Sequence, residues 1–148
     1  MPIDFFDRRA REFQEMYGAK VVFEGPMPDR NNLVWQFVME LVLNCVTNRL
    51  PENPNAGAKK VCVLFELGKL TIRDDFIYPN PESVVKFLAR VAASGKFITT
   101  KPKGTIGEVG IYSIVEDLKP VNGSLTYHEE NGTIVAVVEW DDSKKFLR

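Results

Sequence analysis

With 148 residues, the chain has the length of a single domain that can bury a hydrophobic core. Hydrophobic residues make up 45% of it and charged residues 26%, which is typical of a globular protein rather than a disordered one. The formal net charge of -1 argues against general binding of nucleic acid. No apolar run reaches the ~18 residues expected of a membrane span, so we expect no membrane association.

The first part of the chain predicts two helices separated by a short strand. Apolar side chains recur at helical spacing in residues 4–17, and residues 20–24 form an apolar strand that ends at Gly25-Pro26. A long helix follows and ends near Leu50, before a proline. Three residues can cap its start: Asp29, Asn31 and Asn32.

The second part of the chain predicts two hairpins and two helices. In chain order these are strands 60–66 and 70–74, helices 82–93 and 111–118, and strands 123–129 and 133–140. The last pair of strands flanks the turn Glu130-Asn131-Gly132, the strongest hairpin signal in the sequence. We therefore expect an α+β fold, a two-layer sandwich whose mixed, mostly antiparallel sheet carries helices on one face.

The cysteines and the N-terminus predict a cytoplasmic protein. Cys45 and Cys62 stand among apolar residues without C-x-x-C spacing, which fits buried free thiols in a reducing compartment. Charged residues interrupt the first nine positions, unlike the apolar core of a signal peptide.

Glu40 and Asn44 are unusual in the long helix, because the residues around them are apolar on almost every side. Their spacing of four residues places both on one face, about one turn apart. An acid in such a helix is paired or functional more often than not. A carboxylate here can reach a water molecule while the amide oxygen reaches a metal ion; the alternative is that both side chains point to solvent.

Asp74 ends the strand that begins at Leu70. Strand alternation places Leu70, Ile72 and Asp74 on one face, so the carboxylate points toward the core side and can accept a hydrogen bond from an exocyclic amine. Thr133 opens the last strand, and its hydroxyl can support the same group. The alternatives are a turn-forming acid beside Asp75 and a threonine that simply favours a strand.

A glycine-rich loop with Gly104, Gly107 and Gly110 precedes the 111–118 helix. Glycines let backbone N–H groups approach phosphate oxygens, and a helix N-terminus adds partial positive charge. Lys96 and two further lysines before the loop concentrate positive charge there. A flexible connector is the alternative interpretation. His128 fits an ordinary surface histidine, and Trp35 and Trp140 fit packing residues.

These motifs, in this order, resemble those of the GHKL ATPases, which include DNA gyrase, the large heat-shock chaperone, histidine kinases and MutL-type proteins and share the Bergerat fold. Residues 40–45 resemble the E-L-V-x-N-S box, and residues 104–108 are similar to the G-F-R-G-E of MutL-type proteins. Residues 56–61 and 93–97 resemble two further family segments, the second in the ATP lid. The resemblance spans about residues 31–140 and is nearest to the MutL and type II topoisomerase branch.

The resemblance implies one ATP-binding domain over residues 1–148, with a lid at about residues 94–110. It implies Asn44 as a ligand of Mg²⁺ and Glu40 as the general base that acts on the attacking water. Asp74 and Thr133 would hold adenine. The phosphates would contact the remaining binding residues: Lys96, Gly104, Gly107 and Gly110. The cofactors implied are ATP and Mg²⁺, and the activity implied is weak ATP hydrolysis.

Two departures from the family keep other functions open. Phe76 occupies a position where the family has glycine, and the chain has no second domain to supply a lysine to the terminal phosphate, so we expect slow turnover. The alternatives are a non-enzymatic interaction domain with a degenerate pocket and an anti-sigma-factor-type kinase, against which Glu40 argues. In related proteins lid closure accompanies dimerisation, so a homodimer or a protein partner is also open.

Overall fold

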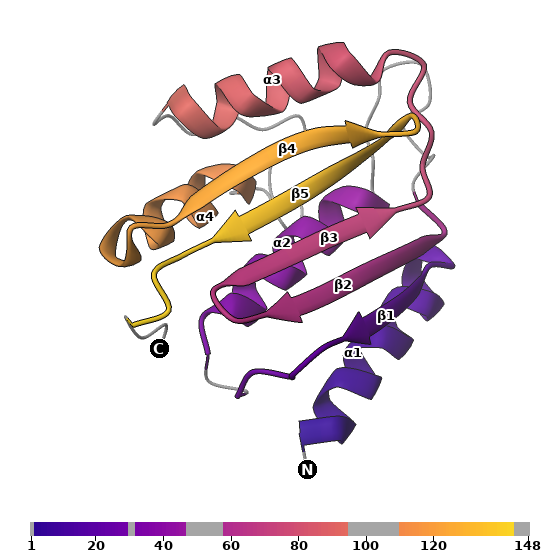
Figure 1. Cartoon of the computed structure of the whole chain (residues 1–148). Coiled ribbons are helices and arrows are strands. Elements are labelled where there is room, and N and C mark those ends of the chain that lie inside the picture. Colours follow the sequence, from indigo (N-terminus) through magenta and orange to yellow (C-terminus); the bar gives the residue numbers. More distant parts are fainter. Residues whose placement is uncertain (1, 30–31, 47–57, 95–109, 144–148) are drawn as a thin grey trace.

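The computed structural model describes residues 2–29, 32–46, 58–94 and 110–143, and its elements match the predicted ones closely (Figure 1). The helices are α1 (Pro2–Tyr17), α2 (Val34–Val46), α3 (Pro81–Ser94) and α4 (Gly110–Leu118), which runs into a 3-10 turn at Lys119–Val121. The strands are β1 (Lys20–Glu24), β2 (Lys60–Glu66), β3 (Lys69–Asp74), β4 (Ser124–Glu130) and β5 (Thr133–Glu139). The predicted extension of α2 to Leu50 lies outside the described residues.

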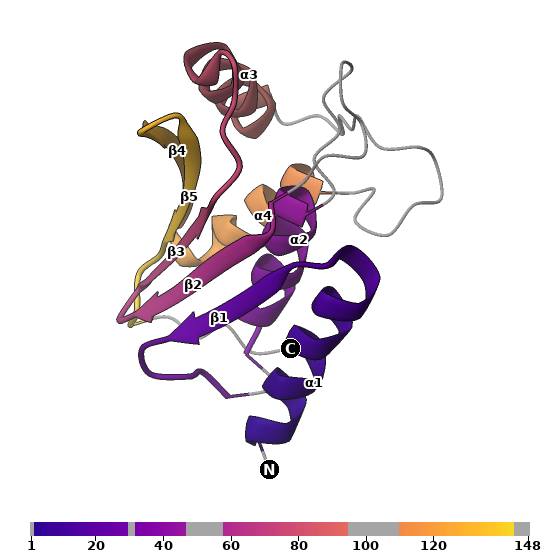
Figure 2. The same cartoon turned by 90° about the vertical axis from the view of Figure 1, so that its right-hand side faces the viewer.

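The strands form one sheet in the order β1-β2-β3-β5-β4. β1 pairs with β2 in parallel, whereas the other three pairings are antiparallel. Figure 2 shows α1, α2 and α4 on one face of the sheet, with α3 alongside β4. The structure therefore confirms the predicted α+β sandwich with a mixed, mostly antiparallel sheet. Among the described helices, none has the length and the apolar run needed to span a membrane.

The core lies between α2 and the face of the sheet that the helices cover, here called the inner face. On β2, Val61, Val63 and Phe65 are buried, while the residues between them are partly accessible. Phe37 and Val42 of α2 are fully buried against this layer. Each such side chain contributes about 1.5–3 kcal/mol when removed from water, so this contact fixes α2 on the sheet.

Both ends of α2 are held by specific contacts. At its start the N–H of Val34 donates to Oδ1 of Asn32 at 3.0 Å, so Asn32, one of the three candidates, caps the helix, and Asn31 lies outside the described residues. The Trp35 ring lies edge-on to Phe65 with centroids 5.0 Å apart, which confirms Trp35 as a packing residue. At the other end the N–H of Ala58 donates to the carbonyl of Cys45 at 2.9 Å. These ties fix the helix that carries Glu40 and Asn44.

Gly25 ends β1 where no larger residue fits. Its φ is +89°, and a Cβ atom there would lie 2.1 Å from the carbonyl oxygen of Phe65. Gly18 also has a positive φ, +66°, but a Cβ atom there would meet nothing within 4 Å. Alanine at Gly25 therefore introduces both a backbone clash and an unfavourable φ, whereas alanine at Gly18 introduces the unfavourable φ alone.

We predict that Gly25→Ala destabilises the fold more than Gly18→Ala. Gly18→Ala is the control, and its free energy of unfolding should fall by about 1–2 kcal/mol because of the left-handed backbone alone. The clash with Phe65 should bring the loss at Gly25 to on the order of 3 kcal/mol. Chemical denaturation of both variants measures the difference, and equal losses would contradict the close approach seen here.

Candidate functional site

Glu40 and Asn44 lie on α2 among residues that face the core. Both side chains are partly buried, and Oε2 of Glu40 is fully shielded from solvent. The expectation that both simply point to solvent therefore does not hold for Glu40. A half-buried carboxylate one turn from a half-buried amide gives this face of α2 two oxygen-bearing groups in an otherwise apolar helix.

Asp74 ends β3 on the inner face of the sheet. In the β2–β3 register it lies opposite Val61, and Ile72 lies opposite Val63, so the carboxylate shares the face of the buried residues. Its Oδ1 accepts the N–H of Phe76 at 2.9 Å. The thiol of Cys45, in the last turn of α2, donates a second hydrogen bond to the same carboxylate. Asp74 is thus held where α2 meets β3.

Burial governs the ionisation of this pair. Desolvation raises the pKa of Asp74 above its ordinary value, although the hydrogen bonds from Cys45 and Phe76 act in the opposite direction. Burial and the nearby Asp74 carboxylate raise the pKa of the Cys45 thiol well above its ordinary value. The thiol therefore stays protonated and acts as a donor, whereas burial makes ionisation of the carboxylate unfavourable to the fold.

Asp75 has a different role from its neighbour. Its Oδ1 accepts the backbone N–H groups of Lys59 at 2.8 Å and Lys60 at 3.2 Å, which fixes the start of β2. Its side chain is exposed, as strand alternation predicts for a residue next to an inward-facing one. Asp74 therefore lies at the candidate site, whereas Asp75 stabilises the start of β2.

Three aromatic residues lie close to the Asp74–Cys45 pair, two in the loop after β3 and one on β4. The rings of Phe76 and Tyr78 meet edge-on with centroids 4.7 Å apart. Tyr127 of β4 lies close enough to Cys45 and Tyr78 to interact with both, and burial raises the pKa of its phenol above the ordinary range. The N–H of Tyr78 donates to the carbonyl of Gly132 at 3.0 Å, and this bond connects the loop after β3 to the β4–β5 turn.

Cys45, Tyr78 and Tyr127 lie at the site but were not among the residues predicted for it from the sequence. A signal was present for two of them. Cys45 directly follows Asn44 in the helix motif, and Tyr127 alternates with Leu125, which is buried on the inner face of β4. Tyr78 lies in a loop, where no periodicity indicates the direction of a side chain.

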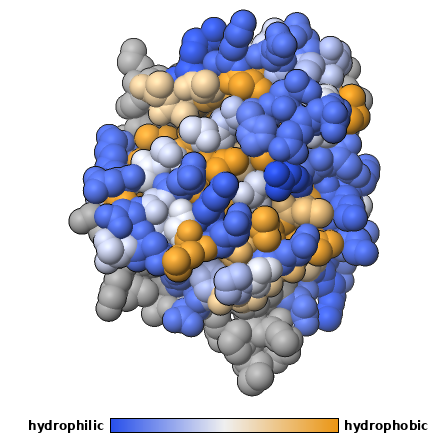
Figure 3. Space-filling view, in the orientation of Figure 1, coloured by the Kyte–Doolittle hydropathy of each residue, from blue (hydrophilic) through white to orange (hydrophobic). Residues whose placement is uncertain are grey.

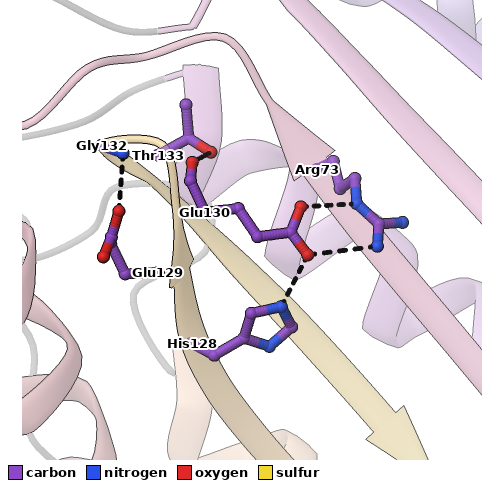
Figure 4. A network of polar contacts seen from close by, with 6 residues as sticks. All are labelled: Arg73, His128, Glu129, Glu130, Gly132 and Thr133. Atoms are coloured by element: carbon purple, nitrogen blue, oxygen red, sulfur yellow. Dashed lines mark hydrogen bonds and ion pairs between the residues drawn. The ribbon is translucent and has the colours of Figure 1, made fainter.

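The register of the last hairpin contradicts the expected role of Thr133 beside Asp74. Tyr127 pairs with Ala136, which pairs with Ile72, so these three residues share the inner face. Thr133 is three positions from Ala136 and therefore faces the opposite side of the sheet, here called the outer face. Its hydroxyl donates to the carbonyl of Glu130 at 2.7 Å (Figure 4). At this level of β5, the buried residue on the inner face is Ile134.

The outer face carries a polar network that is separate from the site (Figure 4). Nε of Arg73 donates to Glu130 at 3.1 Å, and Nε2 of His128 lies 2.8 Å from the same carboxylate. Arg73 and then His128 lower the pKa of Glu130 to about 2. The outer face shows polar side chains with scattered apolar ones (Figure 3). His128 is therefore a surface residue, as the sequence indicated.

The phosphate side of the predicted site lies mostly outside the described residues. Lys96, Gly104 and Gly107 fall in the gap between residues 94 and 110. Gly110 is the first residue of α4. In the described part of the chain, no group of three or more histidine, cysteine or acidic side chains is placed to hold a metal ion.

The chain was compared with known proteins by sequence and by structure. No protein-family model and no curated protein matches it. The histidine kinase domain of the blue-light activated histidine kinase from Erythrobacter litoralis EL346 has a TM-score of 0.59 at 14% identity, over 96% of this chain and 65% of that one. The nucleotide-free catalytic domain of histidine kinase ThkA has a TM-score of 0.55 at 17% identity, over 90% of this chain and 85% of that one.

The chain has the fold of a histidine kinase catalytic domain. It spans less than two thirds of the Erythrobacter litoralis domain, with 65% of that structure covered. Histidine kinases are among the proteins that the motif resemblance names, so the comparison confirms the predicted fold. The placement in the MutL and topoisomerase branch stays a prediction.

We predict that Asp74→Asn stabilises the folded protein near neutral pH. Asparagine keeps an oxygen for the Phe76 and Cys45 donors and removes a partly buried charge. Because the folded state raises the pKa of Asp74, the wild type loses stability as the pH rises from 3.8, the ordinary pKa of an aspartate, through the folded pKa. The gain in Tm of Asp74→Asn over the wild type should therefore be absent below pH 3.8 and should reach a constant value above the folded pKa of Asp74.

Thermal unfolding of both proteins across pH measures this gain. Asp75→Asn is the matched control, because its side chain is exposed and the variant keeps the oxygen that accepts from Lys59 and Lys60. A lower Tm for Asp74→Asn at neutral pH would show that the charge supports the fold instead of opposing it.

Proposed function

We propose that this chain binds an adenine nucleotide, with the exocyclic amine of the base donating to Asp74. The observation that carries the proposal is the Asp74 carboxylate, which the strand register places on the inner face, where it accepts the Phe76 N–H at 2.9 Å and burial opposes its charge. Within the described ranges of the chain, no ion pair joins Asp74 to a basic side chain. A ligand that donates a hydrogen bond would offset the cost of burying this charge. The fold of histidine kinase catalytic domains supports the same interpretation.

Asn44 and Glu40 take the roles that the motif resemblance implies. Mg²⁺ prefers hard oxygen donors and is commonly held by one or two protein ligands together with phosphate oxygens, so the Asn44 amide oxygen fits this ion. When bound, Mg²⁺ neutralises charge on the phosphates. Glu40 would orient a water molecule or accept its proton, and its partly buried position supports a role as a base. We infer weak ATP hydrolysis as the resulting activity.

Residues 94–110 would contact the phosphates as a lid. Lys96 supplies positive charge, and the glycines Gly104, Gly107 and Gly110 let backbone N–H groups approach anionic oxygens. Gly110 opens α4, whose N-terminus adds partial positive charge next to this segment.

A non-enzymatic interaction domain is the second candidate function. Phe76 stands beside Asp74 and packs on Tyr78, at a position where the GHKL motif has glycine. A bulky ring there narrows the space next to the carboxylate. On this alternative the fold is retained and the nucleotide is not bound.

We predict that Asp74→Asn weakens ATP binding while Asp75→Asn does not. Loss of a charged acceptor for the exocyclic amine should cost about 1–3 kcal/mol, or roughly 5- to 150-fold in Kd. Titration calorimetry with ATP and ADP measures the change. Unaltered affinity in Asp74→Asn would remove this residue from the base site, and a wild type that binds neither nucleotide would favour the interaction domain.

We predict separate effects for the two α2 residues. Asn44→Ala should remove the part of nucleotide affinity that depends on Mg²⁺, because it deletes the proposed metal ligand. Glu40→Gln should leave binding unchanged and slow hydrolysis by roughly 10²–10⁴-fold, the usual effect of losing a general base. Binding with and without Mg²⁺ and phosphate release are the two measurements. Wild-type hydrolysis rates in Glu40→Gln would exclude it as the base.

A further inference from the structure

We propose that two copies of this chain pair through β1, so that their sheets join edge to edge across a two-fold axis. β1 is an end strand of the sheet, because β2 is its only neighbouring strand in the described part of the chain. An edge strand presents backbone N–H and C=O groups that a further strand can bind. In Figure 2, β1 lies in front, and α1 packs beside it without crossing it. Pairing through this edge requires no nucleotide.

The backbone of β1 directs alternate residues toward that edge. The N–H of Lys20 donates to the carbonyl of Lys59 at 2.8 Å, so the backbone groups of Lys20 point toward β2. The next residue along the strand, Val21, directs its own N–H and C=O away from β2, and so does Phe23 two positions further on. In an antiparallel pair, residues that point toward each other and stand directly opposite exchange two hydrogen bonds.

One antiparallel register uses the whole strand in both copies. With Val22 opposite the partner's Val22, Val21 lies opposite the partner's Phe23, and the two-fold axis repeats this hydrogen-bonded pair. All 5 residues of β1 then have a partner. A shift by one residue would set outward-pointing backbone groups opposite inward-pointing ones, and a shift by two would shorten the pairing from both ends. Geometry therefore favours the register centred on Val22.

The same register pairs opposite charges at both ends of the strand. It places Lys20 opposite the partner's Glu24, and the two-fold axis repeats the pair at the other end. Both side chains are exposed, and the ion pairs found within the described residues join other side chains. Opposite charges directly across an antiparallel pair stabilise it, whereas like charges destabilise it. Charge complementarity thus selects a second copy of this chain as the partner.

The side chains of β1 keep their packing in such a dimer. The Phe23 ring lies against Trp35 and Phe65 on the inner face, with centroids 5.8 Å and 6.3 Å away, and Val21 is buried on the same face. Val22 is partly accessible and lies on the outer face, where it would meet the partner's Val22 as an apolar pair. Because both copies use the same edge, the assembly closes as a dimer and does not extend into a fibre.

The test is the dimer dissociation constant, measured by analytical ultracentrifugation of the whole chain without nucleotide. The wild type should form dimers whose fraction rises with protein concentration. Lys20→Glu and Glu24→Lys each place like charges at both ends of the interface, so each should weaken dimerisation by about tenfold or more. The double variant restores opposite charges in reversed order and should return to within about threefold of the wild type.

Lys86→Glu is the matched control, because it makes the same charge change at an exposed residue of α3, which packs on β4 at the other end of the sheet. Its dissociation constant should equal that of the wild type. A wild type that stays monomeric at every concentration overturns the proposal, and so does a dimer that both single variants leave unchanged. A double variant that dimerises no better than the single ones also contradicts it.

Amide hydrogen exchange locates the contact on the chain. The N–H of Val21 should exchange more slowly as the concentration of the wild type rises, because it becomes hydrogen-bonded in the dimer. This protection should be reduced in Lys20→Glu. Dimerisation without protection at Val21 would place the interface elsewhere and overturn pairing through β1. None of these measurements involves ATP, so their outcome is separate from that of the proposed function.

Discussion

The hydrogen-bonded contact between the end of α2 and the end of β3 holds a partly buried carboxylate on the inner face of the sheet. Desolvation opposes the charge of Asp74, and the donors from Cys45 and Phe76 offset part of that cost. The arrangement persists because both elements are fixed elsewhere, α2 by its Asn32 cap and β3 by its pairing with β2. The candidate site therefore depends on packing and strand pairing that do not themselves involve the ligand.

Much of the fold was predictable because its signals are local. The apolar spacing of α1, the alternation along β2 and the Asn-Gly turn of the last hairpin each specify one element without reference to another. The inward direction of Asp74 was predictable for the same reason, since it follows from counting along a single strand. The comparison with histidine kinase catalytic domains confirms the resulting architecture.

The errors and omissions at the site have a common cause, since each required knowledge of how two elements meet. Thr133 was misplaced because its face depends on the register with β3, which no pattern within β5 reveals. Cys45 and Tyr127 were missed because a thiol on a helix and a phenol on a strand become neighbours only in the packed molecule. Tertiary contacts of this kind carry no periodic signal in the sequence.

The two tryptophans lie toward the end of the sheet opposite to Asp74. Trp35 packs on Phe65, which pairs with Leu70, and the N–H of Trp140 donates to the carbonyl of Gly68 in the β2–β3 turn. Asp74 is four residues beyond Leu70 on β3, on the order of 13 Å away at about 3.3 Å per residue. Intrinsic tryptophan fluorescence of this protein is therefore a probe of the hydrophobic core near the β2–β3 turn, whereas Tyr78 and Tyr127 lie at the opposite end of the sheet, in the surroundings of Asp74.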